Sequence, residues 1–221
     1  MPKDYPSHLA REEYALLEEL LPAAKLGGRP RTVDLFDILN GILYVFVEGI
    51  RWRALPGDFP PWQTVYTYFR TWRQDGTWLA IHDRLYQWNR LEPGRCGSPS
   101  EAIIDSQSVK SAAGVQEVVG YDGGKQIKGR KRFIVVDTLG LLLRVMVVAA
   151  NVGEQTGARR VLERVWQRGR AVCRLRILWA DGGFGGNPLS RWGMDSYRWV
   201  IQACYALRKV EASRSSNSDG K

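Results

Sequence analysis

The sequence has few of the residues that build metal clusters, disulfide frameworks or membrane spans. Two histidines, His8 and His82, are too few for a histidine-rich metal site. The three cysteines, Cys96, Cys173 and Cys204, are far apart, which argues against a disulfide framework or a zinc cluster. No apolar run approaches the roughly 20 residues that cross a bilayer, and the first residues lack the apolar core of a signal peptide. We therefore expect a cytoplasmic protein.

What the chain does have is an uneven distribution of charge. Residues 1–95 contain 12 Lys/Arg and 12 Asp/Glu, whereas residues 96–221 contain 20 basic and 11 acidic residues, which accounts for the net charge of +9. Basic charge concentrated in one segment is typical of proteins that bind polyanions. A basic surface that serves only solubility remains the alternative.

The first 95 residues read as a helical region that could bind DNA. Amphipathic spacing and turn residues predict four helices, and Thr32 is the expected N-cap of the second, which should end near Gly49. Two helices joined by a tight turn at Asp75-Gly76 are typical of a helix-turn-helix DNA reader, with Arg70, Arg73 and Arg84 nearby. A small bundle packed on its own aromatic residues is the alternative. The predicted helices span residues 9–21, 32–48, 63–75 and 77–91.

A Pro/Gly/Ser-rich break at residues 92–100 separates this region from a segment that reads as strands. Three strands, a helix, a strand, a short helix and a strand predict a mixed sheet flanked by helices, in the order of a ribonuclease-H-like core. A doubly wound nucleotide-binding sheet is the alternative, but no G-x-G-x-x-G follows a strand. The expected elements are 102–107, 132–137, 141–150, 154–168, a strand ending at 181, 188–192 and 197–202.

Two aspartates end short apolar runs and could be brought together by the sheet. Asp105 follows Ala102-Ile103-Ile104, and Asp181 follows Ile177-Leu178-Trp179-Ala180. Paired carboxylates hold hard divalent cations, which position and polarise a phosphodiester. A lone aspartate at a strand end is more often a turn former or helix cap, and Asp137 is better explained by its turn, Asp137-Thr138-Leu139-Gly140.

A basic stretch lies just before one of the predicted strands. Residues 125–132 hold five basic side chains in eight positions, and blocks of this kind contact phosphates without reading bases. A solvated loop is the alternative, but the position beside the aspartates favours DNA. The candidate phosphate-binding residues are Lys110, Lys125, Lys128, Arg130, Lys131 and Arg132.

These segments together resemble one known family. Residues 102–110 resemble the segment around the first Asp of bacterial insertion-sequence transposases with an Asp-Asp-Glu core, specifically the insertion-sequence-five-like group. Residues 128–140 resemble that family's basic strand and hairpin, and residues 179–186 its second Asp segment. The match runs from about residue 9 to Gln202, and further resembling segments are Trp52–Pro56, Trp62–Tyr66 and Ala150–Ala158.

The resemblance implies a function and a set of partners. It implies cutting of double-stranded DNA at element ends and joining of the free 3′ hydroxyl to target DNA, dependent on Mg²⁺ or Mn²⁺. Asp105 and Asp181 would be the metal ligands and the catalytic residues. It also implies a bacterial, nucleoid-associated protein that forms a homo-oligomer on DNA.

The chain departs from the family pattern after Gln202. There the family has a helix with the catalytic Glu, but Glu211 is the sole glutamate beyond Asp181 and its surroundings do not match. We therefore predict a frameshifted or truncated product, or one joined to another frame by programmed frameshifting, with impaired or absent catalysis and a disordered tail at residues 203–221. A DNA-binding fragment that inhibits an intact relative, and a general nuclease of the same fold, are the other hypotheses.

Overall fold

The computed structural model describes residues 5–24, 27, 30–112, 114 and 117–204. Their contacts divide the chain into two compact units, Met1–Trp88 and Asn89–Lys221. The division falls inside a helix, whereas the sequence predicted it in the loop that follows. Arg90 explains the difference, because this arginine on the last turn of the helix is buried and pairs with Asp137 of the second unit.

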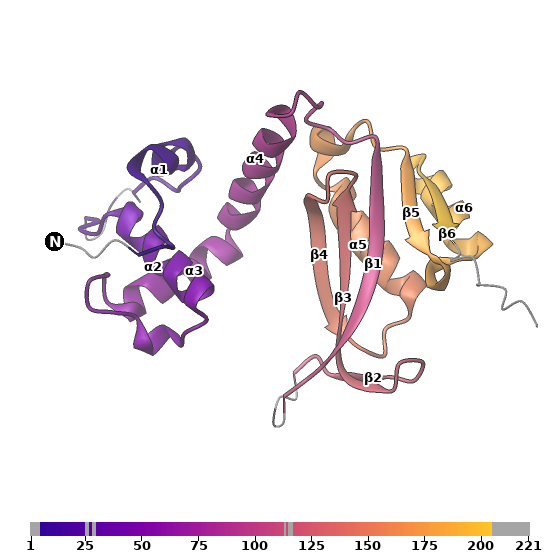
Figure 1. Ribbon diagram of the computed structural model, residues 1–221, viewed down its shortest axis with the longest axis horizontal. Coiled ribbons are helices and arrows are strands. Elements are labelled where there is room, and N and C mark those ends of the chain that lie inside the picture. Colours follow the sequence, from indigo (N-terminus) through magenta and orange to yellow (C-terminus); the bar gives the residue numbers. More distant parts are fainter. Residues whose placement is uncertain (1–4, 25–26, 28–29, 113, 115–116, 205–221) are drawn as a thin grey trace, which may run out of the picture. The chain divides into compact units, whose positions relative to one another are not determined.

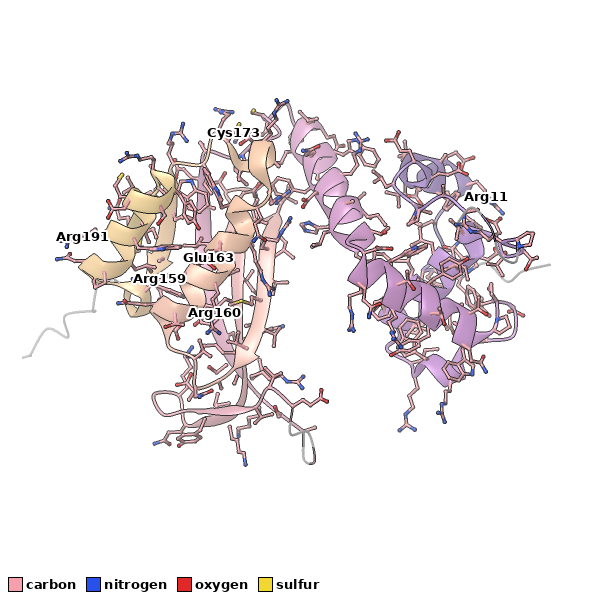
Figure 2. All side chains as sticks on the ribbon, turned by 180° about the vertical axis from the view of Figure 1, so that it is seen from behind. Arg11, Arg159, Arg160, Glu163, Cys173 and Arg191 are labelled. Carbon is pink, nitrogen blue, oxygen red and sulfur yellow. The ribbon has the colours of Figure 1, made fainter. Side chains whose placement is uncertain are left out.

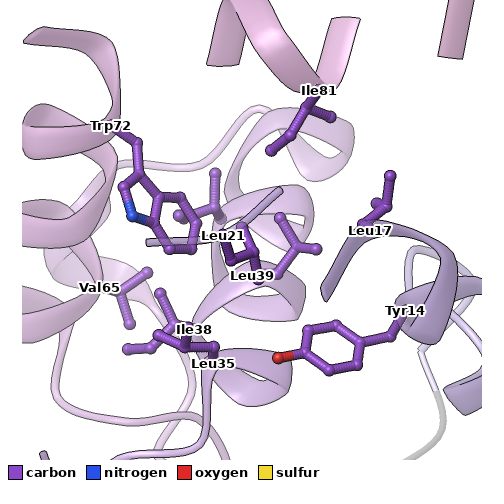
Figure 3. Packing of buried hydrophobic residues seen from close by; sticks show 10 residues of the cluster. Tyr14, Leu17, Leu21, Leu35, Ile38, Leu39, Val65, Trp72 and Ile81 are labelled. Carbon is purple, nitrogen blue, oxygen red and sulfur yellow. The ribbon is translucent and has the colours of Figure 1, made fainter. Parts of the chain in front are cut away.

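The first unit is helical and packs around one hydrophobic cluster. Tyr14 and Leu17 from the first helix meet Ile38 and Leu39 from the second, with Trp72 closing the cluster from the third (Figure 3). Burial of such side chains contributes about 1.5–3 kcal/mol each, which explains how short helices are held in place. The elements are α1 (Arg11–Glu18), α2 (Leu35–Glu48), η1 (Trp52–Ala54), α3 (Trp62–Gln74) and α4 (Thr77–Leu91).

The second helix begins later than predicted, so the expectation that Thr32 caps it was wrong. Asp34 is the N-cap, and its Oδ1 accepts a hydrogen bond of 2.8 Å from the Phe36 amide. An aspartate there also compensates the positive end of the helix dipole. The predicted end is confirmed, because Gly49 takes a left-handed conformation with φ of 65° at the C-cap.

The second unit is built on a mixed sheet with six strands in its described residues (Figure 1). The order is β2-β3-β1-β5-β6, and β4 pairs with the edge of β3 that faces away from β1. The β1–β3 and β3–β4 pairs are antiparallel, whereas β1–β5 and β5–β6 are parallel. The strands are β1 (Glu101–Lys110), β2 (Gly120–Asp122), β3 (Ile127–Asp137), β4 (Leu142–Ala149), β5 (Ile177–Asp181) and β6 (Val200–Cys204).

Helices of this unit cover one face of the sheet. Helix α5 (Glu154–Trp166) packs on β3 and β4, and α6 (Asn187–Tyr197) packs on β6. Both helices lie behind the strands in Figure 1 and in front of them in Figure 2. We call the side that α5 and α6 contact the covered face and the opposite side the open face. The short helices η2 (Gly169–Val172) and η3 (Gly182–Phe184) flank β5.

This strand order and the one-sided helices confirm the predicted ribonuclease-H-like arrangement. Several bounds differ from the prediction: β1 extends to Lys110 rather than residue 107, α6 is longer than the predicted 188–192, and β6 begins at Val200 rather than residue 197 and ends at Cys204, inside the predicted tail. Strand β3 begins five residues earlier than predicted, because Lys128, Arg130 and Arg132 alternate with buried residues and can face solvent on the open side. Strand β2 was not predicted, since Gly120, Tyr121 and Asp122 are too short a run to show a period. In the described residues no helix is long and apolar enough to cross a membrane.

A candidate metal site and nucleic-acid interface

The two aspartates singled out in the sequence are neighbours in the sheet. Ile104 on β1 pairs with Ala180 on the parallel strand β5, so Asp105 and Asp181 occupy the next position on each strand. Asp105 follows the buried Ile104, and Asp181 follows the buried Ala180. Because side chains alternate between the two faces of a strand, the exposed aspartates point to the open face. Topology alone therefore brings together two residues that are far apart in the chain.

Neither carboxylate is neutralised by a cation in the described part of the chain. Asp105 Oδ1 accepts a hydrogen bond from the Ser106 amide at 2.7 Å, and Asp181 Oδ1 accepts one from the Gly183 amide at 3.0 Å. These bonds orient each carboxylate and leave its second oxygen free of a described partner. Two adjacent negative groups without a counter-ion repel each other, so a bound divalent cation would stabilise the pair.

The alternation of β3 sorts the basic stretch between the two faces of the sheet. Lys128, Arg130 and Arg132 lie on the open face, where Arg132 pairs in register with Gln107, two residues along β1 from Asp105. Arg132 also donates a hydrogen bond to the Gln107 side chain. Three of the six candidate phosphate-binding residues thus lie on the same face as the carboxylate pair.

A basic depression follows the aspartates along this face. It has a volume of about 450 Å³, and Arg130 at its wall has a buried Nε without a hydrogen-bond partner in the described residues. The Nη2 of Arg130 donates to the Glu117 carbonyl at 3.1 Å, and the remaining guanidinium donors of Arg130 and Arg132 are suited to phosphate oxygens. Lys125 lies close by and donates from Nζ to the Ser106 carbonyl at 3.4 Å. The depression is lined by Val109, Lys110, Ser111, Ala112, Arg130, Arg132 and Val147.

Lys131 lies on the covered face, apart from the other basic residues. Its amine is buried and lies 3.1 Å from both the Asp122 and Glu154 carboxylates. Burial lowers the pKa of Lys131, but the hydrogen bonds and charges of Glu154 and Asp122 outweigh it and the net pKa is raised. We therefore assign Lys131 a structural role and leave it out of the proposed phosphate contacts.

The partners of Lys131 were missed in the sequence, although each had a local signal. Asp122 precedes two glycines, and its Oδ1 accepts from the amides of Gly124 and Lys125, as a turn-forming aspartate does. A hydrogen bond from Ser108 is the largest of the effects that hold the pKa of Asp122 well below its usual range. Glu154 is the acidic residue in the first turn of α5. Nothing local indicated that the two acids share one lysine.

Two further predicted residues have structural partners. Asp137 accepts from the Leu139 and Leu141 amides, which agrees with its predicted turn, and its other oxygen pairs with Arg90. Arg84, expected near a DNA-reading helix, pairs with Glu19 of α1. Glu211 lies outside the described residues.

The site fits a divalent metal ion in part. Two exposed carboxylates are hard oxygen ligands of the kind that Mg²⁺ and Mn²⁺ prefer, and both side chains are accessible from one side. No cluster of three acidic, histidine or cysteine side chains suited to a metal occurs in the described ranges. The described ligand set is therefore two carboxylates, with the remaining coordination positions open to water or phosphate.

Comparison with known proteins finds family matches in two parts of the chain. Residues 9–82 match the family described as "Putative transposase of IS4/5 family", and residues 97–209 match the family described as "Transposase DDE domain". The second match alone spans half of the chain. A curated relative, the "Insertion element IS402 uncharacterized 16.2 kDa protein" of Burkholderia cepacia, is 30% identical over 117 residues, which cover 48% of this chain and 76% of the relative.

Solved structures of transposases are also similar to the chain. A piggyBac transposase synaptic complex with hairpin DNA aligns with a TM-score of 0.44 and 12% identity, covering 93% of this chain and 50% of that one. A Mos1 transposase paired-end complex with the left transposon end aligns with a TM-score of 0.32 and 12% identity, covering 81% of this chain and 61% of that one. The chain thus spans about half to three-fifths of these two proteins. From its family matches, the chain belongs to the insertion-sequence transposases with a DDE domain.

Proposed function

We propose that this protein binds double-stranded DNA of an insertion element along the open face of its sheet, as part of DNA transposition. The observation that carries the proposal is the parallel pairing of β1 and β5, which sets Asp105 beside Asp181 on the face that also presents Arg130 and Arg132. Guanidinium groups would hold the phosphates, while the carboxylates lie where a scissile phosphodiester would pass.

Asp105 and Asp181 would hold Mg²⁺ or Mn²⁺ in this function. When bound, such a cation polarises the phosphodiester and lowers the pKa of a coordinated water. The described residues supply two carboxylates for this task, and Glu211, whose surroundings do not match the family's Glu segment, lies outside them. We propose that metal-dependent strand cleavage and transfer by this chain alone is weak, because two carboxylates hold a second cation poorly.

The experiment uses purified full-length protein and a labelled duplex with the terminal repeat of the encoding element, with and without Mg²⁺ or Mn²⁺. We expect specific binding that weakens steeply with salt and little nicking at the repeat boundary. Efficient nicking that Asp105→Asn abolishes would overturn the proposed impairment and would mean that another acid completes the site. Absence of any duplex binding would overturn the proposed function itself.

Metal binding is tested separately from activity. Mn²⁺ titration followed by electron paramagnetic resonance should show a site that weakens at least about tenfold in Asp105→Asn or Asp181→Asn, because each removes one of two charged ligands. The matched control is Asp195→Asn, an exposed acid on α6 away from the pair. Equal Mn²⁺ affinity in all three variants would exclude the aspartate pair as the metal site.

An inhibitory role is the second candidate function. It is favoured by the combination of an accessible basic face and a described ligand set of only two acids. A protein that binds element ends without cutting them would compete with an active relative for the same DNA. Adding this chain to a transposition reaction of an intact relative should lower the yield, and Arg132→Ala should restore it.

A further inference from the structure

A second depression lies at the other end of β5, away from the aspartate pair. It has a volume of about 570 Å³ and lies where α5 and α6 end and where β5 and β6 begin. Cys173, labelled in Figure 2, belongs to its rim. Its lining combines three aromatic rings with three arginines: Trp166, Gly169, Arg170, Val172, Cys173, Arg176, Tyr197, Arg198 and Trp199.

The aromatic rings form a packed group that is open to solvent on one side. The ring centres of Trp166 and Tyr197 are 4.9 Å apart, and Tyr197 lies 4.9 Å from Trp199. Trp199 is 1% exposed and serves the core, whereas Trp166 is 47% exposed. Packing within this chain accounts for Trp199 but leaves much of the Trp166 ring in water, where a large apolar surface is unfavourable.

The arginines surround these rings and are exposed. Arg176 donates from Nη1 to the carbonyls of Cys173 and Leu175, which holds its guanidinium at the rim. Arg170 and Arg198 form no ion pair in the part of the chain that the structure describes. Burial raises the pKa of Tyr197, and the nearby Glu163 carboxylate adds a smaller effect in the same direction.

Arg198 also has an unusual backbone conformation. It is the C-cap of α6, with φ of 60° and ψ of 32°, in the left-handed region that favours glycine. An arginine at such a position lowers stability relative to glycine, so its side chain is the feature that would explain its presence. That side chain lines the depression.

We propose that this depression binds single-stranded DNA, with an unpaired base stacked on Trp166 and Tyr197 and its flanking phosphates held by Arg170 and Arg198. Exposed aromatic rings next to a basic groove are the means by which proteins bind single strands without reading sequence. The three arginines complement a polyanion, and a volume of about 570 Å³ accommodates a base and its sugar.

The site is distinct from the metal site in position and in the form of DNA it takes. Arg176 precedes β5 and Asp181 ends it, so about five residues of strand, roughly 16 Å, separate the two. This inference rests on the proposed function in one respect: the single-stranded DNA would come from transposition, since DNA that is cut and joined exposes unpaired ends.

The test measures binding of a fluorescent short oligothymidylate to the full chain by anisotropy, together with quenching of tryptophan fluorescence. Trp166→Ala should weaken binding by about tenfold, because base–aromatic stacking contributes that much, and Trp166→Phe should recover most of the loss. Arg198→Gly should weaken binding several-fold while preserving or raising the melting temperature, since glycine relieves the left-handed backbone.

The control variant is Arg191→Ala, which removes an equal charge from α6 outside the depression (Figure 2). It should bind the oligothymidylate within about twofold of wild type, as expected for a charge that makes no direct contact. Wild-type affinity in Trp166→Ala, or an equal loss in Arg191→Ala and Arg198→Gly, would overturn the proposal. Affinity for a duplex is measured in parallel. If the wild-type protein binds the oligothymidylate but no duplex, the proposed function is contradicted and the single-strand site is still supported.

Discussion

The two faces of the sheet use the same kinds of charged residue in opposite ways. On the covered face, Lys131 is buried between Asp122 and Glu154. On the open face, Asp105 and Asp181 are exposed and have no cationic partner in the described residues. Burial makes an unpaired charge costly, so the covered face must satisfy its charges internally, whereas the open face can keep its charges for a ligand.

The comparison teaches that position within the alternation of a strand decides the role of a charge. Lys131 and Arg132 are consecutive on β3 and belong to one basic stretch, yet they point to opposite faces.

The largest expected effect is the loss of the buried ion pair between Arg90 and Asp137 within the second unit. Arg90→Ala removes a buried cationic partner of the fully buried Asp137, and breaking a buried pair costs about 3–5 kcal/mol. Asp105→Asn on the open face should change stability by about 0.5 kcal/mol or less. Urea unfolding followed by tryptophan fluorescence measures both. A loss below about 1 kcal/mol for Arg90→Ala would mean that the pair is not essential for folding.

The next effect separates stability from DNA binding at two consecutive residues. Lys131→Ala leaves two acids unpaired and should lower the free energy of unfolding by about 2–4 kcal/mol. Arg132→Ala should leave stability nearly unchanged but weaken duplex binding and reduce the salt slope by about one. The measurements are chemical unfolding and anisotropy at several salt concentrations. If Lys131→Ala lost duplex affinity while keeping full stability, the assignment of the two roles would be reversed.

The sequence predicted most elements of the sheet because their apolar residues are regular and their ends are marked. Asp105 and Asp181 were predicted as a pair because each ends an apolar run, and the parallel register of β1 and β5 agrees with that placement. Lys131 was assigned to the phosphate contacts, because five neighbouring basic residues look alike until the strand register is known.

Long-range partners could not be predicted, for a physical reason. The Arg90–Asp137 pair joins residues 47 positions apart, and neither residue type prefers the other locally. The aromatic depression was missed in the same way, because Trp166, Tyr197 and Trp199 meet only when α5, α6 and β6 pack. Periodicity indicates which face a residue occupies but not which residue it meets there.

A pH titration tests the buried cluster of Asp122, Lys131 and Glu154 on the covered face. The lowered pKa of Asp122 means that its contribution is present above about pH 4, the unfolded value, and is lost as pH falls toward the folded value. The raised pKa of Lys131 gives a contribution that is present below about pH 10 and is lost as pH rises through the folded value. Melting temperatures should therefore fall at both extremes. Asp122→Asn should flatten the acid side of the curve, whereas Asp195→Asn should leave its shape unchanged.

The smallest effect tests the openness of the face itself. Val147 and Val148 are consecutive on β4, but Val147 is 49% exposed on the open face and Val148 is 8% exposed on the covered face. Val148→Thr places a hydroxyl among apolar side chains and should cost about 1–2 kcal/mol, whereas Val147→Thr should cost less than about 0.5 kcal/mol. Thermal unfolding of both variants measures the difference. An equal cost for Val147→Thr would mean that another part of the protein covers this face in solution, and DNA would then have to displace it to reach Asp105 and Asp181.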